Sequence, residues 1–158
     1  MYENETGEKL KRPSISDDAV NLLIGAALEG LSKAFLKKEG DTRYGAAAMT
    51  LNGKIYNAGQ YSSFNNITNI HAEMASVLLA TMNNDPIVTA LALVSSNSSD
   101  AYARICGICR EFLNEHSQRT GYDIRIILSS LDRTNIRTFY IDELLPEKWI
   151  ANKGVKIK

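Results

Sequence analysis

The chain contains only two cysteines, Cys106 and Cys109, and two residues separate them. In a chain with no other cysteine, a pair at this spacing indicates metal binding or redox chemistry more than a structural disulfide. A second short window, His71-Ala72-Glu73, lies upstream. Each window opens a segment that we expect to be helical. If the imidazole and both thiols hold one ion, the fold must bring two helix starts together.

The position of these residues at helix starts suits metal binding. Zinc binds thiolates, and a helix N-terminus lowers the pKa of a cysteine because it stabilises the anion. Two sulfurs and the His71 imidazole fill three of the four tetrahedral positions of zinc, and a fourth position left to water is typical of a catalytic site. One difficulty is that His71 and Glu73 point in directions about 200° apart around a regular helix. They converge only if both lie in the first turn and the metal lies off its end.

Hydrophobic periodicity and turn signals predict the order of helices and strands. Apolar residues recur at helical spacing from Val20 to Phe35, after the candidate caps Ser14 and Ser16. The tripeptide 51–53 marks a tight turn between two short strands, the first of which is unusually rich in alanine and lets another element approach closely. In chain order, we expect a helix over 17–37, strands over 45–50 and 54–59, a helix over 71–82 capped by Thr68 or Asn69, a strand over 87–95, a helix over 106–116, strands over 124–128 and 137–140, and a helical segment over 141–149. This order predicts an α/β fold, a three-layer α-β-α sandwich with a central mixed five-stranded sheet.

The composition is that of an ordinary globular protein, with 158 residues, 44% hydrophobic and 23% charged. Eighteen Lys and Arg balance 18 Asp and Glu, so no basic excess indicates a nucleic-acid partner, and we expect none. No apolar run approaches the ~18 residues of a membrane span, so we expect no membrane partner. Residues 1–13 are expected to form a flexible tail and lack the apolar stretch of a secretory signal, which predicts a cytoplasmic location.

The two windows together resemble a known family. His-x-Glu followed by Cys-x-x-Cys is the signature of zinc deaminases, and the string Cys-Gly-x-Cys-Arg at 106–110 is similar to the cytidine deaminase branch. Three further segments, 45–47, 52–56 and 143–146, are similar to that branch in composition and order. The resemblance spans roughly residues 42–149 and implies that residues 14–158 form a single zinc deaminase domain.

The resemblance implies a role for each residue of the motif. His71, Cys106 and Cys109 would bind Zn²⁺, which activates a water molecule, and Glu73 would move protons as the catalytic acid and base. The backbones of Ala72 and Gly107 would line the pocket for the base. The expected reaction converts a cytosine-type nucleoside, such as cytidine, deoxycytidine or an analogue, to the uracil-type product and ammonia.

The segment expected to recognise the sugar departs from the family. The family's Asn-Val-Glu-Asn falls on Gln60-Tyr61-Ser62-Ser63, which makes Gln60 and Ser62 the candidate substrate-binding residues and replaces a carboxylate by a serine. The family's proline before the first cysteine is Ile105. The aromatic that stacks on the base stays open between Phe64, Tyr61 and Tyr44, each of which equally suits the core. An unusual substrate such as blasticidin S is therefore an alternative to cytidine.

Three other functions each conflict with a feature of the sequence. Deamination of a base in RNA or DNA conflicts with the balanced charge, and a thioredoxin-like redox role conflicts with the polar, irregular segment before Cys106. A zinc-stabilised binding or interaction module that has lost the reaction would have no need of Glu73. The resemblance further implies a small-molecule, nucleoside-like substrate and a homo-oligomer, a tetramer or otherwise a dimer.

Overall fold

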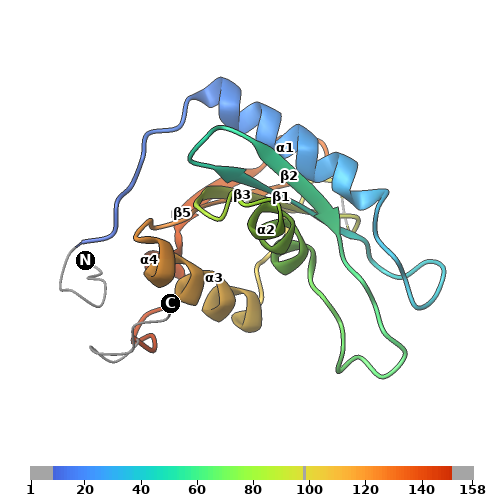
Figure 1. The fold of residues 1–158 in the computed structure, drawn as a ribbon. Helices are drawn as coiled ribbons and strands as arrows, with labels where there is room; N and C mark the ends of the chain where they lie inside the picture. The colour runs from blue at the N-terminus through green and yellow to red at the C-terminus, as the bar shows by residue number, and fades with distance from the viewer. Residues whose placement is uncertain (1–8, 98, 151–158) are drawn as a thin grey trace.

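The first helix, α1 (Asp17–Leu31), lies along one face of the sheet in this computed structural model, which describes residues 9–97 and 99–150 (Figure 1). Ser16 is the N-cap residue just before α1, and its backbone is extended. Its side chain accepts a hydrogen bond from the Ala19 N–H at 3.2 Å. Asp17 and Asp18 follow in the first turn, where acidic groups stabilise the helix dipole.

The helix ends at Leu31, not near Lys37 as the apolar stripe predicted. The Arg43 guanidinium donates hydrogen bonds to the carbonyls of Leu31 and Ala34, which closes the C-terminal end. Phe35 then pairs with the edge of the sheet, because its N–H donates to the Gln60 carbonyl at 2.8 Å. This contact between distant segments outweighs the local helical pattern.

The sheet is mixed and five-stranded, as expected. Its order is β2-β1-β3-β4-β5, and β3 and β4 are parallel while the other neighbours are antiparallel. The strands are β1 (Tyr44–Thr50), β2 (Ile55–Gly59), β3 (Val88–Ser95), β4 (Arg125–Ser129) and β5 (Ile136–Tyr140).

Helices cover both faces of the sheet, which confirms the three-layer sandwich. Helix α2 (Ala72–Met82), helix α3 (Gly107–Thr120) and the short α4 (Ile141–Leu144) lie on the face opposite α1 (Figure 1). Alternate residues of β1 enter the two cores, since Ala46 and Ala48 pack on the α2 and α3 side and Ala47 and Met49 on the α1 side. The predicted segment 141–149 is helical only over its first turn.

Small residues let α1 approach β1 and β2 closely, as the alanine-rich strand indicated. A Cβ atom on Gly45 would lie 2.2 Å from the Ala27 carbonyl oxygen, and one on Gly30 would lie 2.5 Å from the Ala58 carbonyl oxygen. These distances are shorter than any van der Waals contact. Glycine at these two positions therefore sets how deeply α1 is seated.

A flexible tail is expected over residues 1–13, and residues 1–8 of it lie outside the described residues. Within residues 9–13, Leu10 is buried and Lys11 forms a parallel bridge with Tyr122. Arg12 forms a salt bridge with Asp123 at 2.8 Å and lies over the Tyr140 ring. The packed region therefore begins before residue 14. Among the described residues, no helix has the length and apolar character needed to cross a membrane.

Candidate active site

Two helix starts carry the predicted metal ligands. His71 is the residue before the first turn of α2 and has an extended backbone, with φ −72° and ψ 151°. Cys106 holds the same place before α3, with φ −76° and ψ 165°. Neither side chain hydrogen-bonds to its own helix start. The imidazole and the thiol are therefore free to turn toward each other, and the expected caps Thr68 and Asn69 do not hold that position.

The three predicted ligands meet at one point. The His71 Nδ1 atom lies 3.1 Å from the Cys109 sulfur and 3.3 Å from the Cys106 sulfur. All three donor atoms lie within 4.8 Å of one another. Donors of a tetrahedral zinc ion are separated by about 3.5–3.8 Å, given Zn–S near ~2.3 Å and Zn–N near ~2.0 Å. The two N–S distances are slightly shorter than this separation, so the donors enclose one zinc-sized cation after a small outward shift.

The cluster has three protein donors, which leaves room for a further ligand. Among the described residues, no fourth histidine, cysteine or carboxylate belongs to it. Cys109 is buried, Cys106 is exposed, and His71 has intermediate exposure. The site is therefore closed toward the core and open on one side, which is the arrangement of a catalytic rather than a structural zinc site.

Glu73 lies next to this cluster without belonging to it. It is the second residue of α2, and its side chain is almost fully buried, with 4% exposed. Burial raises the pKa of the Glu73 carboxyl, while the nearby His71 imidazole and Cys109 thiol act in the opposite direction. Because His71 precedes the helix, the expected divergence of His71 and Glu73 around a helix does not arise.

The buried thiol of Cys109 needs a cation to become a thiolate. Burial raises the pKa of Cys109 strongly, and the neighbouring Glu73 carboxyl and Cys106 thiol raise it further. A divalent cation between the donors reverses this balance, since metal binding displaces the thiol protons. The chemistry of the donor set thus agrees with its geometry.

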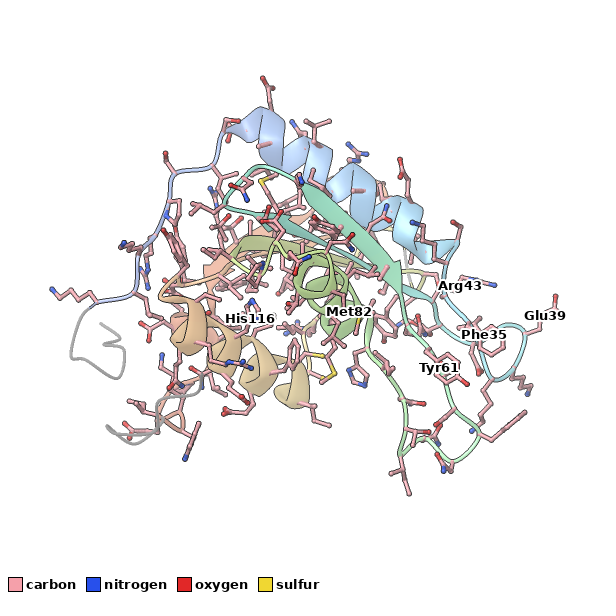
Figure 2. All side chains as sticks on the ribbon, viewed as in Figure 1. Phe35, Glu39, Arg43, Tyr61, Met82 and His116 are labelled. Atoms are coloured by element: carbon pink, nitrogen blue, oxygen red, sulfur yellow. The ribbon has the colours of Figure 1, made fainter. Side chains whose placement is uncertain are left out.

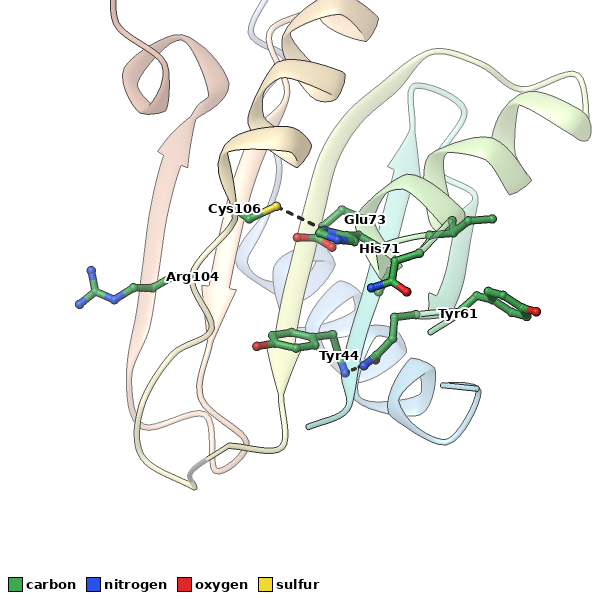
Figure 3. Close-up of a pocket in the computed structure, with 10 residues that line it drawn as sticks. Tyr44, Tyr61, His71, Glu73, Arg104 and Cys106 are labelled. Atoms are coloured by element: carbon green, nitrogen blue, oxygen red, sulfur yellow. Dashed lines mark hydrogen bonds between the residues drawn. The ribbon is translucent and has the colours of Figure 1, made fainter. Parts of the chain in front are cut away.

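A cavity of about 210 Å³ opens beside the cluster (Figure 3). It is smaller than the ~300–1,000 Å³ typical of sites for drug-sized ligands, so it suits one small ring rather than a large ligand. Its lining residues come from β1, from the segments before and at the start of α2, and from the loop before α3. They are Tyr44, Gln60, Tyr61, Asn69, Ile70, His71, Ala72, Glu73, Arg104 and Cys106.

The residues predicted to bind substrate are only partly brought together. Gln60 lines the cavity, but its amide holds the backbone, because Oε1 accepts from the Tyr44 N–H at 2.5 Å and Nε2 donates to the Thr42 carbonyl at 2.7 Å. Ala72 lines the cavity and is fully buried. Ser62 faces a different cavity, and Gly107 is exposed at the start of α3, outside the lining of this one.

Of the three candidate aromatics, Tyr44 and Tyr61 line the cavity and Phe64 does not. Tyr61 stacks on Phe35 with ring centroids 5.4 Å apart, at the far end of the molecule from α4 (Figure 2). Phe64 is 89% exposed in the loop before α2. Tyr44 packs partly against the core and lines the cavity together with Glu73, so it is the candidate of the three that best suits contact with a ligand there.

Sequence reasoning missed Asn69, Ile70 and Arg104 as cavity residues. Asn69 was expected only as a cap, yet its Oδ1 accepts hydrogen bonds from the N–H and Oγ of Ser63 and so ties the loop before α2. Arg104 lies in an irregular segment, where no periodicity indicates which way a side chain points. The nearby cysteine motif was the only available signal.

Comparison with known proteins identifies the fold of the chain but no sequence family. No model of a known protein family matches the sequence, and no curated protein matches it. Among solved structures, the cytidine deaminase of Burkholderia pseudomallei matches with a TM-score of 0.72 at 20% identity, over 85% of this chain and 100% of that chain. The cytidine deaminase of Mycobacterium tuberculosis matches with a TM-score of 0.68 at 24% identity, over 85% of this chain and 98% of that chain. The cytidine deaminase of Bacillus anthracis matches with a TM-score of 0.61 at 19% identity, over 82% of this chain and 88% of that chain. The chain therefore has the fold of cytidine deaminases.

Proposed function

We propose that this chain is a zinc-dependent hydrolytic deaminase that acts on a cytosine-type nucleoside or a related compound. The observation that carries the proposal is the buried Glu73 carboxyl beside three converging zinc donors at the wall of a small cavity. A purely structural zinc site has no use for a buried carboxyl that does not bind the metal. The similarity of the fold to cytidine deaminases supports the same conclusion.

The donor set and Glu73 divide the chemistry between them. His71, Cys106 and Cys109 would hold Zn²⁺, which when bound supplies Lewis-acid activation of water. The Glu73 carboxylate takes a proton from that water and delivers it to N3 of the ring, and then passes a proton to the amino group as the C4–N bond breaks. Water thus supplies the new C4–O bond and both protons, and the products are a uracil-type ring and ammonia.

The protein also positions the ring. The buried Ala72 forms the wall next to His71, and Tyr44 offers an aromatic face in the same cavity. Gln60 is committed to the backbone of residues 42 and 44, and Ser62 lies elsewhere. The sugar side of the substrate must therefore be recognised by other residues, which favours a modified nucleoside over plain cytidine.

A homo-oligomer stays part of the proposal. Helix α2 leaves Leu78, Leu79 and Met82 exposed, and Ile108 at the start of α3 is 67% exposed. Exposed apolar side chains on these two helices favour a subunit contact that involves both helices. Light scattering at several concentrations distinguishes a tetramer or dimer from a monomer.

The test is an ultraviolet assay of zinc-loaded protein with cytidine, deoxycytidine, cytidine monophosphate, cytosine and blasticidin S. We expect turnover of at least one of them, and a loss of at least about 10²–10⁴ in rate for Glu73→Gln with zinc retained. Glu39→Gln is the matched control, because Glu39 is exposed on a loop far from the cluster (Figure 2). Turnover that Glu73→Gln leaves intact contradicts the mechanism, and a lack of turnover on every compound favours the zinc-stabilised binding module.

A further inference from the structure

Arg104 stands at the mouth of the candidate active site. It lies in the segment just before Cys106 and is exposed. It lines the cavity of about 210 Å³ and also a neighbouring cavity of about 290 Å³, and Tyr44 lines both as well. The two cavities therefore lie next to each other, with Tyr44 and Arg104 at the boundary between them.

The guanidinium of Arg104 points away from His71 and Glu73 (Figure 3). Among the described residues, no carboxylate lies within salt-bridge distance of it, and its contact is with the Tyr102 ring, 5.3 Å from the ring centroid. Contact with an aromatic face attracts the guanidinium while leaving its N–H donors free for another partner. Within the described part of the chain, the arginine is therefore a cation that lacks a protein anion.

Arg104 is the one charged residue among the described residues that line the neighbouring cavity. The other described lining residues are neutral: Tyr44, Ser95, Asn97, Ala101, Tyr102 and Ala103. The Asn97 Oδ1 accepts a hydrogen bond from the Thr42 hydroxyl at 2.5 Å, and within the described part of the chain its Nδ2 donor has no partner. A free amide donor and a free guanidinium at one cavity are complementary to an anion.

The cavity beside the metal cluster does not repel an anion. Zn²⁺ with two thiolates and a neutral imidazole has a formal charge of zero, so the Glu73 carboxyl is the acidic group of the inner cavity. Glu73 is buried on the metal side, whereas Arg104 faces the outer side. A substrate with its ring at Glu73 and a negative group at Arg104 matches the charges at both ends.

We propose that the substrate carries an anionic group, a phosphate or a carboxylate, on the part distant from the cytosine ring, and that Arg104 binds this group. The proposal rests on the proposed deaminase function. A planar guanidinium binds either anion through two parallel N–H donors, which a lysine cannot reproduce. Arg104 would thus take over the recognition that Gln60 and Ser62 do not provide.

The kinetic test compares kcat/KM for cytidine, cytidine 5′-monophosphate and cytidine 5′-carboxylate. We expect wild type to prefer one anionic compound over cytidine, and Arg104→Gln to lower kcat/KM for that compound by about 10- to 100-fold with little change for cytidine. Arg104→Lys should recover only part of the loss. Arg119→Gln, at the other end of α3 and exposed, removes the same charge and should change neither value.

A binding measurement separates this inference from the deaminase proposal. Equilibrium titration of Glu73→Gln with cytidine and the two anionic compounds reports recognition without turnover. Anion-dependent affinity that Arg104→Gln abolishes supports the inference even if no compound is deaminated. If cytidine is deaminated as well as the anionic compounds, and Arg104→Gln affects all three equally, the inference is overturned while the deaminase proposal stands.

Discussion

His71 and Cys106 hold the same position in two different helices, since each is the last extended residue before the first turn. Their side chains meet, with the Cys106 sulfur 3.3 Å from the His71 Nδ1 atom. Both helix N-termini, with their partial positive charge, therefore face the same point. Glu73 and Cys109 enter at that same point from the two first turns.

The first prediction concerns this junction. Cys109→Ser should abolish zinc binding and lower the melting temperature, because the buried Cys109 sulfur ties α3 to the start of α2. Zinc content by plasma emission spectroscopy and thermal unfolding with and without chelator measure both effects. Arg119→Gln is the control, since Arg119 is exposed near the other end of the same helix. Full zinc content in Cys109→Ser would remove that residue from the metal site.

The fold could largely be predicted from sequence because hydrophobic periodicity follows burial. The strand predicted over 87–95 is mostly apolar and rich in β-branched residues, and β3 is buried along its whole length. The ends of elements depend on contacts that periodicity does not contain. Helix α1 ends where Arg43 hydrogen-bonds to the carbonyls of Leu31 and Ala34 and the Gln60 carbonyl accepts from the Phe35 N–H.

The candidate site likewise has one part that the sequence predicts and one part that it does not. The three donors and Glu73 are set by short spacings at helix starts, which sequence shows directly. The divergence of His71 and Glu73 disappears once His71 is seen to precede the helix, a distinction of one residue that periodicity cannot resolve. The cavity mouth depends on irregular segments, so Arg104 and the true partners of Gln60 could not be predicted.

A second prediction follows from those partners. Gln60→Ala removes the hydrogen bonds to the Tyr44 N–H and the Thr42 carbonyl, and should lower the free energy of unfolding by about 1–2 kcal/mol. It should also raise KM, because Tyr44 is positioned by the lost contact. Urea unfolding and steady-state kinetics give the two values. Gln60→Glu keeps the acceptor for Tyr44 and should recover part of the stability; equal losses in both variants would contradict this account.

A third prediction tests the seating of α1. Gly45→Ala places a methyl group 2.2 Å from the Ala27 carbonyl oxygen, so it should destabilise the protein by about 1–3 kcal/mol or prevent folding. Gly107→Ala is the matched control for stability, because no atom lies within 4 Å of the added Cβ. It should fall within about 0.5 kcal/mol of wild type. Unfolding free energies that rank the two substitutions in the reverse order would show that the contact between α1 and β1 is misplaced.

The last prediction concerns pH. Burial lowers the pKa of His116, whose Nε2–H donates to the Pro86 carbonyl at 2.7 Å, so the folded protein protonates this imidazole less readily than the unfolded chain does. The unfolded chain binds a proton below about pH 6.5, so acid favours unfolding through this residue. The stabilising contribution is present above that pH and is lost as the pH falls below it.

His116→Gln isolates this contribution, because glutamine can donate to Pro86 but does not titrate. Denaturant unfolding at pH 5.5 and 7.5 should show a smaller loss of stability on acidification in the variant than in wild type. The other histidine, His71, and the two cysteines are the same in both proteins, so the difference between the two profiles reports on His116 alone. Two parallel pH profiles would mean that His116 titrates equally in the folded and unfolded chain and that its burial has no energetic consequence.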